Sequence, residues 1–157
     1  DVKRAEDSVL ENVEKLLKSW DNNTGKRPIE IKDVMGETMN KNVGVFRTHN
    51  DLSKAYDILV GLQRDFLKAQ VSTEDRKFNY GLLRNLELRS LLDIAEATAY
   101  AALWRKESRG GHYRWDYDSR DDENFLNHSM IYRVRDGLDL KTKPVVLGVF
   151  EVKERKY

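Results

Sequence analysis

A stretch near the middle of the chain, NYGLLRNLELRSLLDIAEATAYAALW at 79–104, constrains the fold more than any other feature. Apolar residues occupy most sides of its second half, and alanine is frequent there. A helix with this pattern is buried among other helices, because its alanines let neighbours approach closely. At about 1.5 Å per residue it is roughly 40 Å long. The stretch predicts the central helix of a bundle, ending near Gly110 and Gly111, since glycine readily adopts the left-handed conformation that closes helices.

Apolar residues at steps of three and four predict three more helices before this one. The first ends at DNNTGK, residues 21–26. The second begins with Pro28, whose missing N–H costs nothing in a first turn. The third begins at Thr48 and Asp51, spaced as a capping box in which hydroxyl and carboxylate satisfy free backbone N–H groups. The three apolar faces comprise Val2, Ala5, Val9, Leu10, Val13, Leu16, Leu17 and Trp20; Ile31, Val34, Met35 and Met39; and Leu52, Ala55, Tyr56, Leu59, Leu62, Phe66 and Leu67.

Beyond residue 127 the composition favours strands. HSMIYRV at 128–134 and LDLKTKPVVLGVFEV at 138–152 are rich in β-formers, and RDG at 135–137 suits a hairpin turn. The predicted fold is therefore mainly α: an antiparallel three-helix bundle, like a spectrin repeat, with an extra N-terminal helix and a C-terminal β-hairpin tail. We expect an N-terminal helix and linker at 1–27, a helical bundle domain at 28–112, and a docking loop with the hairpin tail at 113–157, forming one compact unit.

Charge and composition exclude several classes of function. The chain has 28 basic and 27 acidic residues, so its net charge of +1 provides no overall attraction to nucleic acid or anionic lipid. Cysteine is absent, which excludes disulfides, thiolate metal sites and thiol nucleophiles. No apolar run approaches the roughly 20 residues that span a bilayer, and no signal-peptide pattern opens the chain. We expect a soluble chain without direct membrane insertion. Its start at Asp1 fits a processed product or a piece of a larger protein.

One loop, ESRGGHYRWDYDSRDDENFLNHS at 107–129, concentrates charged and aromatic residues. Tyr113, Trp115 and Tyr117 among arginines resemble a single-stranded nucleic-acid surface, but the interleaved acids would repel a phosphate backbone. A metal site would use His112, Asp116 and His128, whose spacing matches no known ligand pattern.

Two other interpretations of this loop involve its serine and its arginines. Hydrolysis by Ser108 with His112 would need an orienting acid and an oxyanion hole, and the spacing indicates neither. In a purely structural interpretation, Arg109 and Arg114 form ion pairs and carbonyl contacts that fix the loop, while the aromatic residues cover the end of the bundle.

The same loop resembles the C-terminal region of the flavoprotein subunits of succinate dehydrogenase and fumarate reductase. MNKNVGVFR at 39–47 and the KPV and ERKY stretches near the end are also similar to this family, whereas Trp115, Asp118 and Phe125 depart from its pattern. The long tail is more similar to the fumarate and succinate enzymes than to L-aspartate oxidase. The matching loop residues are Glu107, Ser108, Arg109, Gly110, His112, Arg114, Asp116, Tyr117, Arg120, Asp121, Asp122 and His128.

The resemblance implies a parent enzyme that moves two electrons between a dicarboxylate and FAD, and then to an iron–sulfur subunit. The family holds FAD through a Gly-x-Gly-x-x-Gly loop. The chain has no such loop, so we assign it no catalytic, cofactor-binding or metal-binding residue and expect it to be inactive alone. Its expected partners are the subunit's own FAD-binding and capping domains and the iron–sulfur subunit, with no nucleic acid.

We expect the charged loop to act as a domain or subunit interface in a cytoplasmic enzyme that is membrane-associated through partner subunits. The alternatives are the C-terminal domain of L-aspartate oxidase and a stand-alone helical interaction module. The direction of turnover and the electron acceptor stay open. The predicted interface residues are Glu107, Ser108, Arg109, His112, Arg114 and Asp116.

Overall fold

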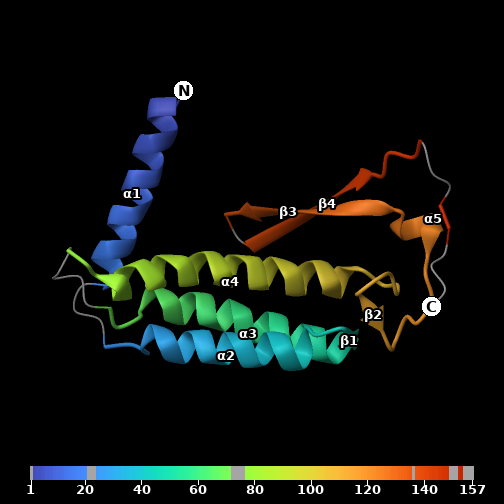
Figure 1. The fold of residues 1–157 in the computed structure, drawn as a ribbon, viewed down its shortest axis with the longest axis horizontal. Helices are drawn as coiled ribbons and strands as arrows, with labels where there is room; N and C mark the ends of the chain where they lie inside the picture. The colour runs from blue at the N-terminus through green and yellow to red at the C-terminus, as the bar shows by residue number, and fades with distance from the viewer. Residues whose placement is uncertain (1, 21–23, 72–76, 136, 149–151, 154–157) are drawn as a thin grey trace.

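The structure is a computed structural model that describes residues 2–20, 24–71, 77–135, 137–148 and 152–153. Three long helices lie side by side, a further helix rises from one end, and a β-hairpin lies along the outer side of the last long helix (Figure 1). The mainly helical fold with a C-terminal hairpin is therefore confirmed. The elements are α1 (Val2–Trp20), α2 (Pro28–Asn42), β1 (Phe46–Arg47), α3 (His49–Leu67), α4 (Tyr80–Trp104), β2 (Tyr113–Arg114), α5 (Asp122–Phe125), β3 (Asn127–Val134) and β4 (Gly137–Pro144).

The helix α4 is central, as its composition predicts: it packs against α2 and α3 on one side and against both hairpin strands on the other. Alanines line its buried face, which allows the close approach of neighbouring helices. The core of the bundle is formed by Ile31, Met35, Leu52, Ala55, Leu59, Leu62, Phe66, Leu88, Leu92, Ala95, Ala99 and Ala102.

Parts of the predicted apolar faces are wrong. Val34 is 41% exposed, because the buried stripe of α2 follows Ile31, Met35, Thr38 and Asn42 and so includes two polar residues. Leu67 at the end of α3 is also exposed, since the packed face of that helix ends at Phe66. The sequence period places such a stripe only to within about one residue on each side.

The helix starts are close to those predicted. Pro28 opens α2, and the Thr48 hydroxyl caps α3 by accepting a hydrogen bond from the N–H of Asp51 at 3.2 Å. The second half of the predicted capping box is wrong. The Asp51 carboxylate accepts a hydrogen bond from the Thr48 hydroxyl at 2.7 Å instead of from a backbone N–H group. An Asn79 cap, in which Oδ1 accepts from the N–H of Leu82 at 2.8 Å, begins α4.

The predicted end of the central helix near Gly110 and Gly111 is wrong, since α4 ends at Trp104. The carbonyls of its last turn are capped by the side chain of Arg114, so no glycine is needed there. Gly110, with φ +58°, instead forms part of a two-residue turn between Arg109 and His112. These two residues exchange backbone hydrogen bonds of 2.8 and 3.0 Å.

The predicted hairpin is confirmed, with β3 and β4 antiparallel and Val134 paired with Gly137. Asp136 of the RDG turn lies outside the described residues. The second predicted strand is too long, because β4 ends at Pro144, opposite Asn127. Proline cannot donate to a ladder, and the chain before Asn127 turns into α5, so no partner strand continues. Residues 149–151 and ERKY at 154–157 lie outside the described residues.

The junction between α1 and the bundle involves close backbone contact. The Trp20 Nε1–H donates to the carbonyl of Phe66 at 3.0 Å, and the two rings pack edge to face. The N–H of Gln70 donates to the carbonyl of Lys26 at 3.1 Å. A Cβ atom on Gly25 would lie 1.9 Å from the carbonyl oxygen of Lys68, so this position accepts only glycine without a backbone shift.

None of the helices in the described parts of the chain is long and apolar enough to cross a membrane. The division into parts at 1–27, 28–112 and 113–157 stays a prediction.

Candidate functional site

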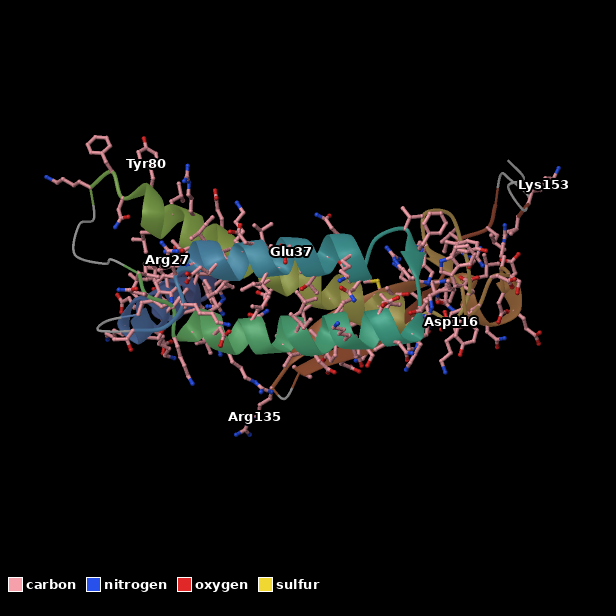
Figure 2. The ribbon with its side chains drawn as sticks, turned by 90° about the horizontal axis from the view of Figure 1, so that it is seen from below. Arg27, Glu37, Tyr80, Asp116, Arg135 and Lys153 are labelled. Atoms are coloured by element: carbon pink, nitrogen blue, oxygen red, sulfur yellow. The ribbon has the colours of Figure 1, made fainter. Side chains whose placement is uncertain are left out.

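The six predicted interface residues lie together at the end of the bundle where α4 ends and α3 begins; Asp116 marks this end in Figure 2. Two of them, Glu107 and Arg114, are fully buried at 0% exposure. We call the set Glu107, Ser108, Arg109, His112, Arg114 and Asp116 the loop cluster. The contacts within the chain show how many donors and acceptors of these six side chains already have partners.

Arg114 joins three parts of the chain. Its Nε and Nη2 donate to the two carboxylate oxygens of Asp116 at 2.8 and 2.7 Å, and its Nη1 donates to the carbonyls of Ala102 and Arg105 at 3.0 and 3.1 Å. The Asp116 carboxylate also accepts from the N–H of His49 at 3.0 Å, in the positively polarised first turn of α3. The hydrogen bonds from Arg114 lower the pKa of Asp116 from 3.8 to about 2. The pair thus links the end of one helix to the start of another.

Glu107 is a buried carboxylate surrounded by donors. It accepts from Arg109 Nε and Nη2 at 2.8 and 2.9 Å, from Arg105 Nη1, and from the N–H of Asp121 at 2.9 Å. Burial is the largest influence on its pKa and raises it, but the hydrogen bonds from Arg109, Asp121 and Arg105 together outweigh burial and lower the pKa. Glu107 is therefore charged at neutral pH, and Arg109 extends the cluster to Asp122 at 2.7 Å.

The hairpin is tied to the loop cluster by Arg105. Its Nη2 donates to the carbonyl of Asn127 at 2.9 Å and to the hydroxyl of Ser129 at 3.0 Å, while its Nη1 donates to the carbonyl of Phe125 at 2.9 Å. Since Arg105 follows the last residue of α4, the position of the hairpin depends on where that helix ends.

His112 is held by a partner on each ring nitrogen. Nδ1 lies against Arg47 Nη1, and Nε2 lies 3.1 Å from the carbonyl of Arg105. Arginine can only donate, so Nδ1 accepts and Nε2 carries the hydrogen, which makes the ring neutral. Burial is the largest cause of the lowered pKa of His112, and the neighbouring Arg47, Arg114 and Arg105 cations lower it further.

These contacts bear on the chemical alternatives for the loop. The Ser108 hydroxyl donates to the carbonyl of Tyr117 at 2.8 Å and accepts from the N–H of Arg114 at 2.8 Å, so it is not oriented by His112. Within the ranges that the structure describes, no three His, Cys, Asp or Glu side chains lie close enough to hold a metal ion. The cluster has the geometry of the structural interpretation: Arg109 and Arg114 form ion pairs, and Arg114 also contacts carbonyls.

The exposed side of this end of the bundle is aromatic, a feature that the sequence interpretation missed in part. Parallel pairing of β1 with β2 brings Phe46 beside Tyr113 and Trp115. Phe46 and Trp115 stack with ring centres 5.6 Å apart and are 63% and 62% exposed. The signal was the alternation Tyr113–Arg114–Trp115, which places the arginine inward and both rings outward on a strand. We call Phe46, Tyr113 and Trp115 the aromatic ridge.

Two of the pockets formed by the described residues lie at opposite ends of the bundle. One of about 520 Å³ lies beside the loop cluster, between α4 and β3, and includes Arg47, Arg105 and His112 in its wall. These three side chains already bind acceptors or donors within the chain. The other, of about 740 Å³, lies between the starts of α2 and α4, at the opposite end of the bundle.

The described residues do not fit the pyrophosphate of FAD. Such a site needs a glycine-rich loop between a strand and a helix in a parallel sheet. The parallel pair in the described ranges is β1–β2, with two residues in each strand. The glycines of positive φ, Gly110 and Gly137, belong to the loop turn and the hairpin.

Comparisons with known proteins agree on one family. A family model described as "Fumarate reductase flavoprotein C-term" matches residues 32–157. The fumarate reductase flavoprotein subunit of Haemophilus influenzae is 35% identical over 129 residues, which covers 82% of this chain and 22% of the relative. The succinate dehydrogenase flavoprotein subunit of Coxiella burnetii is 35% identical over 118 residues, covering 74% and 20%.

A solved structure of quinol fumarate reductase from E. coli has the same fold. It matches with a TM-score of 0.84 and 35% identity, covering 92% of this chain and 26% of that chain. The chain therefore spans about a quarter or less of the length of the proteins that it matches.

Proposed function

The chain belongs to the family of C-terminal regions of fumarate reductase flavoprotein subunits, and from this membership we propose that it is the C-terminal helical domain of a fumarate reductase or succinate dehydrogenase flavoprotein subunit. The observation that carries the proposal is the family match over residues 32–157. The agreement of the helical fold with that of a quinol fumarate reductase chain supports it.

In this proposal the whole subunit interconverts succinate and fumarate with FAD and exchanges electrons with an iron–sulfur subunit. The chain contributes by docking and not by catalysis. FAD is held by parts of the subunit outside this chain, which agrees with the poor fit of the described residues to a pyrophosphate. Quinols are electron carriers dissolved in membranes, so the quinol in the name of the E. coli relative supports an association with a membrane. We propose a cytoplasmic enzyme that makes this association through its partner subunits.

The names of the matched relatives favour this branch over the two alternatives. The Haemophilus influenzae relative is a fumarate reductase subunit and the Coxiella burnetii relative is a succinate dehydrogenase subunit. Neither name supports L-aspartate oxidase or a stand-alone helical module.

The test is to purify the natural protein that contains this chain. We expect one flavin per subunit, fumarate reduction with a reduced dye as donor, and succinate oxidation with a dye as acceptor. Oxidation of L-aspartate in place of succinate would favour the alternative enzyme. A natural polypeptide that begins near Asp1 and carries no flavin would contradict the proposal altogether.

For the loop cluster we propose a role in docking onto the flavin-containing part of the subunit or onto the iron–sulfur subunit. Its buried ion pairs would set the shape of this end, and the exposed aromatic ridge would make the contact. A rigid aromatic surface loses little side-chain entropy on binding, which supports this division of roles.

The docking role predicts that Phe46→Ser and Trp115→Ser lower the yield of assembled enzyme and its flavin content. Tyr132→Ser, which removes an exposed ring from β3, is the matched control and should leave both unchanged. Arg109→Ala and Arg114→Ala should act in the same direction, through the shape of the loop. Normal assembly and flavin content in all four variants would refute the docking role.

A further inference from the structure

Only one end of α1 is packed. Near its C-terminus, Leu16 and Trp20 are buried, and the helix contacts α3 there. Farther toward the N-terminus the helix stands clear of the bundle (Figure 1), and Val9 and Leu10 are 61% and 62% exposed. Large apolar side chains are thus solvent-exposed on a helix whose other end contributes to the core.

The exposed and buried apolar residues belong to one continuous face. Val9, Val13, Leu16 and Trp20 follow one another at steps of four, three and four, which places them along one side of a helix. Leu10 lies at the edge of this side. We call Val9, Leu10 and Val13 the free stripe of α1.

The opposite side of α1 is charged throughout. Arg4, Glu11, Lys15 and Lys18 are exposed, and Glu11 pairs with Lys15 at 2.6 Å. This helix is therefore amphipathic over a length greater than the bundle covers. An apolar stripe is typical of a helix face that packs against another element. The free stripe therefore indicates that α1 has a second packing surface beyond its contact with the bundle.

The base of α1 holds the helix at a defined angle. Trp20 is fixed by its hydrogen bond to the carbonyl of Phe66 and by ring packing, and Gly25 lies against the backbone at Lys68. The free stripe is consequently presented in one direction instead of folding back onto the bundle.

We propose that the free stripe packs against the part of the same subunit that precedes α1. This inference rests on the proposed function. The relatives are about four to five times longer than the matched region, and that region is C-terminal, so the remaining polypeptide joins at the N-terminal end of α1.

The small size of the free stripe favours this occupant over a second chain. A stable interface between separate proteins uses about 20–30 residues a side, far more than the free stripe provides. A segment in the same chain binds at a high effective concentration and needs much less surface.

Cysteine labelling of the flavin-containing subunit tests the proposal. The chain has no cysteine of its own, so Val9→Cys, Leu10→Cys and, on the opposite side, Glu11→Cys each introduce a single thiol into it. The probe is a maleimide, and mass spectrometry of the α1 peptide separates its label from that on other thiols in the subunit. We expect labelling at positions 9 and 10 to be at least tenfold slower than in denaturant, and labelling at position 11 to be nearly unchanged.

Equal labelling at positions 9, 10 and 11 in a subunit with full flavin content would overturn the inference while leaving the proposed function intact. A subunit that lacks flavin and succinate activity would instead refute the proposed function. Protection that disappears on dilution would assign the free stripe to a second copy, and protection that disappears when the iron–sulfur subunit is removed would assign it to that partner. Either result would overturn the inference.

Discussion

The guanidinium of Arg114 meets two kinds of acceptor while its side chain is fully buried: the carboxylate of Asp116 and main-chain carbonyls at the end of α4. Those carbonyls carry the partial negative charge of the helix end, which favours a nearby cation. A planar fork with donors on several sides can serve both at once, whereas the ammonium of lysine cannot. The requirement at this position is therefore for arginine and not simply for positive charge.

Arg114→Met should lower the free energy of unfolding by about 3–5 kcal/mol, because the Asp116 carboxylate loses its charged partner and the carbonyls at the end of α4 lose the guanidinium donor. Arg114→Lys should lower it less, since the charge remains. Urea unfolding of the chain measures both. Arg120→Met is the control: its partner Asp122 is exposed, so the loss should stay below about 1 kcal/mol. Similar losses in the Met variants of Arg114 and Arg120 would contradict this account.

Gly110→Ala should destabilise the chain by about 1–2 kcal/mol, because an alanine at φ +58° adopts the left-handed conformation. Gly111, the next residue, does not have a positive φ. Gly111→Ala should therefore change the free energy of unfolding by no more than about 0.5 kcal/mol. Neither new Cβ atom would have a neighbour within 4 Å, so the difference isolates backbone conformation. Denaturant melts of the two variants provide the comparison, and equal stabilities would disprove the assignment of strain to Gly110.

At the residue scale, the sequence predicts which kind of interaction a side chain makes better than it predicts which part of the fold that side chain contacts. The ion pairs of Arg109 and Arg114 could be predicted, because arginine between acids in a loop has few other uses. The capping of α4 by Arg114 could not be predicted, because this residue lies ten positions after the helix and reaches it only when the loop is folded. The inclusion of Phe46 in the aromatic ridge likewise required the pairing of β1 with β2, which are separated by two helices.

At the scale of elements, an ion-pair network adds to the contacts of Arg105 in holding the hairpin on the bundle. Arg133 of β3 donates to Glu96 at 2.7 Å and to Asp93 at 2.8 Å, both on α4. Gln63 of α3 donates to the same two carboxylates. Glu96 is almost fully buried, and its hydrogen bond is the largest cause of the raised pKa of Arg133. Two helices and a strand thus share one charged centre.

Arg133→Met should destabilise the chain by about 1–3 kcal/mol, less than for a fully buried pair because the arginine side chain is half exposed. Amide hydrogens of β3 should exchange faster as the hairpin loosens from α4. The matched control is Lys141→Met on β4. Lys141 and Asp139 form an exposed pair at 3.7 Å, so its loss should change neither the stability nor the exchange rates appreciably. If both variants exchanged at the same rate, the network would not be what holds the hairpin.

The helices themselves could be predicted because hydrophobic periodicity, caps and Pro28 act locally. Their exact packed faces could not. Thr38 and Asn42 are buried in place of Val34 because α2 is rotated to fit α3 and α4, and a single helix contains no information on that rotation. The strand β4 stops at Pro144 for a similarly non-local reason, the turn of its partner into α5.

For the whole molecule, the titratable groups of the loop cluster predict how stability depends on pH. The pKa of His112 is lower in the folded chain than its ordinary 6.5, and that of Asp116 falls from 3.8 to about 2. Below each ordinary value the unfolded chain therefore binds more protons than the folded chain, so stability falls as pH falls.

Urea unfolding between pH 2 and 8 should show constant stability near neutral pH, a first decline below about 6.5 from His112, and a steeper decline from about 4 toward 2 from Asp116 and Glu107. His112→Gln keeps a donor and an acceptor but cannot be protonated, so it should abolish the first decline. His128→Gln is the control and should retain it. An unchanged profile in His112→Gln would show that this ring does not couple to folding.

The close approach of Gly25 to the carbonyl of Lys68 has an evolutionary consequence for the molecule. The segment at Gly25 and Lys26 is packed against residues 68–70 through main-chain atoms, and these contacts do not depend on the identity of the neighbouring side chains. A related chain could then differ along most of α1 and keep the same orientation of this helix, provided that it retains both Trp20 and the glycine at position 25. Substitutions that accumulate on the exposed surface of α1 should therefore leave the direction of the helix unchanged, even when few of its surface residues remain the same.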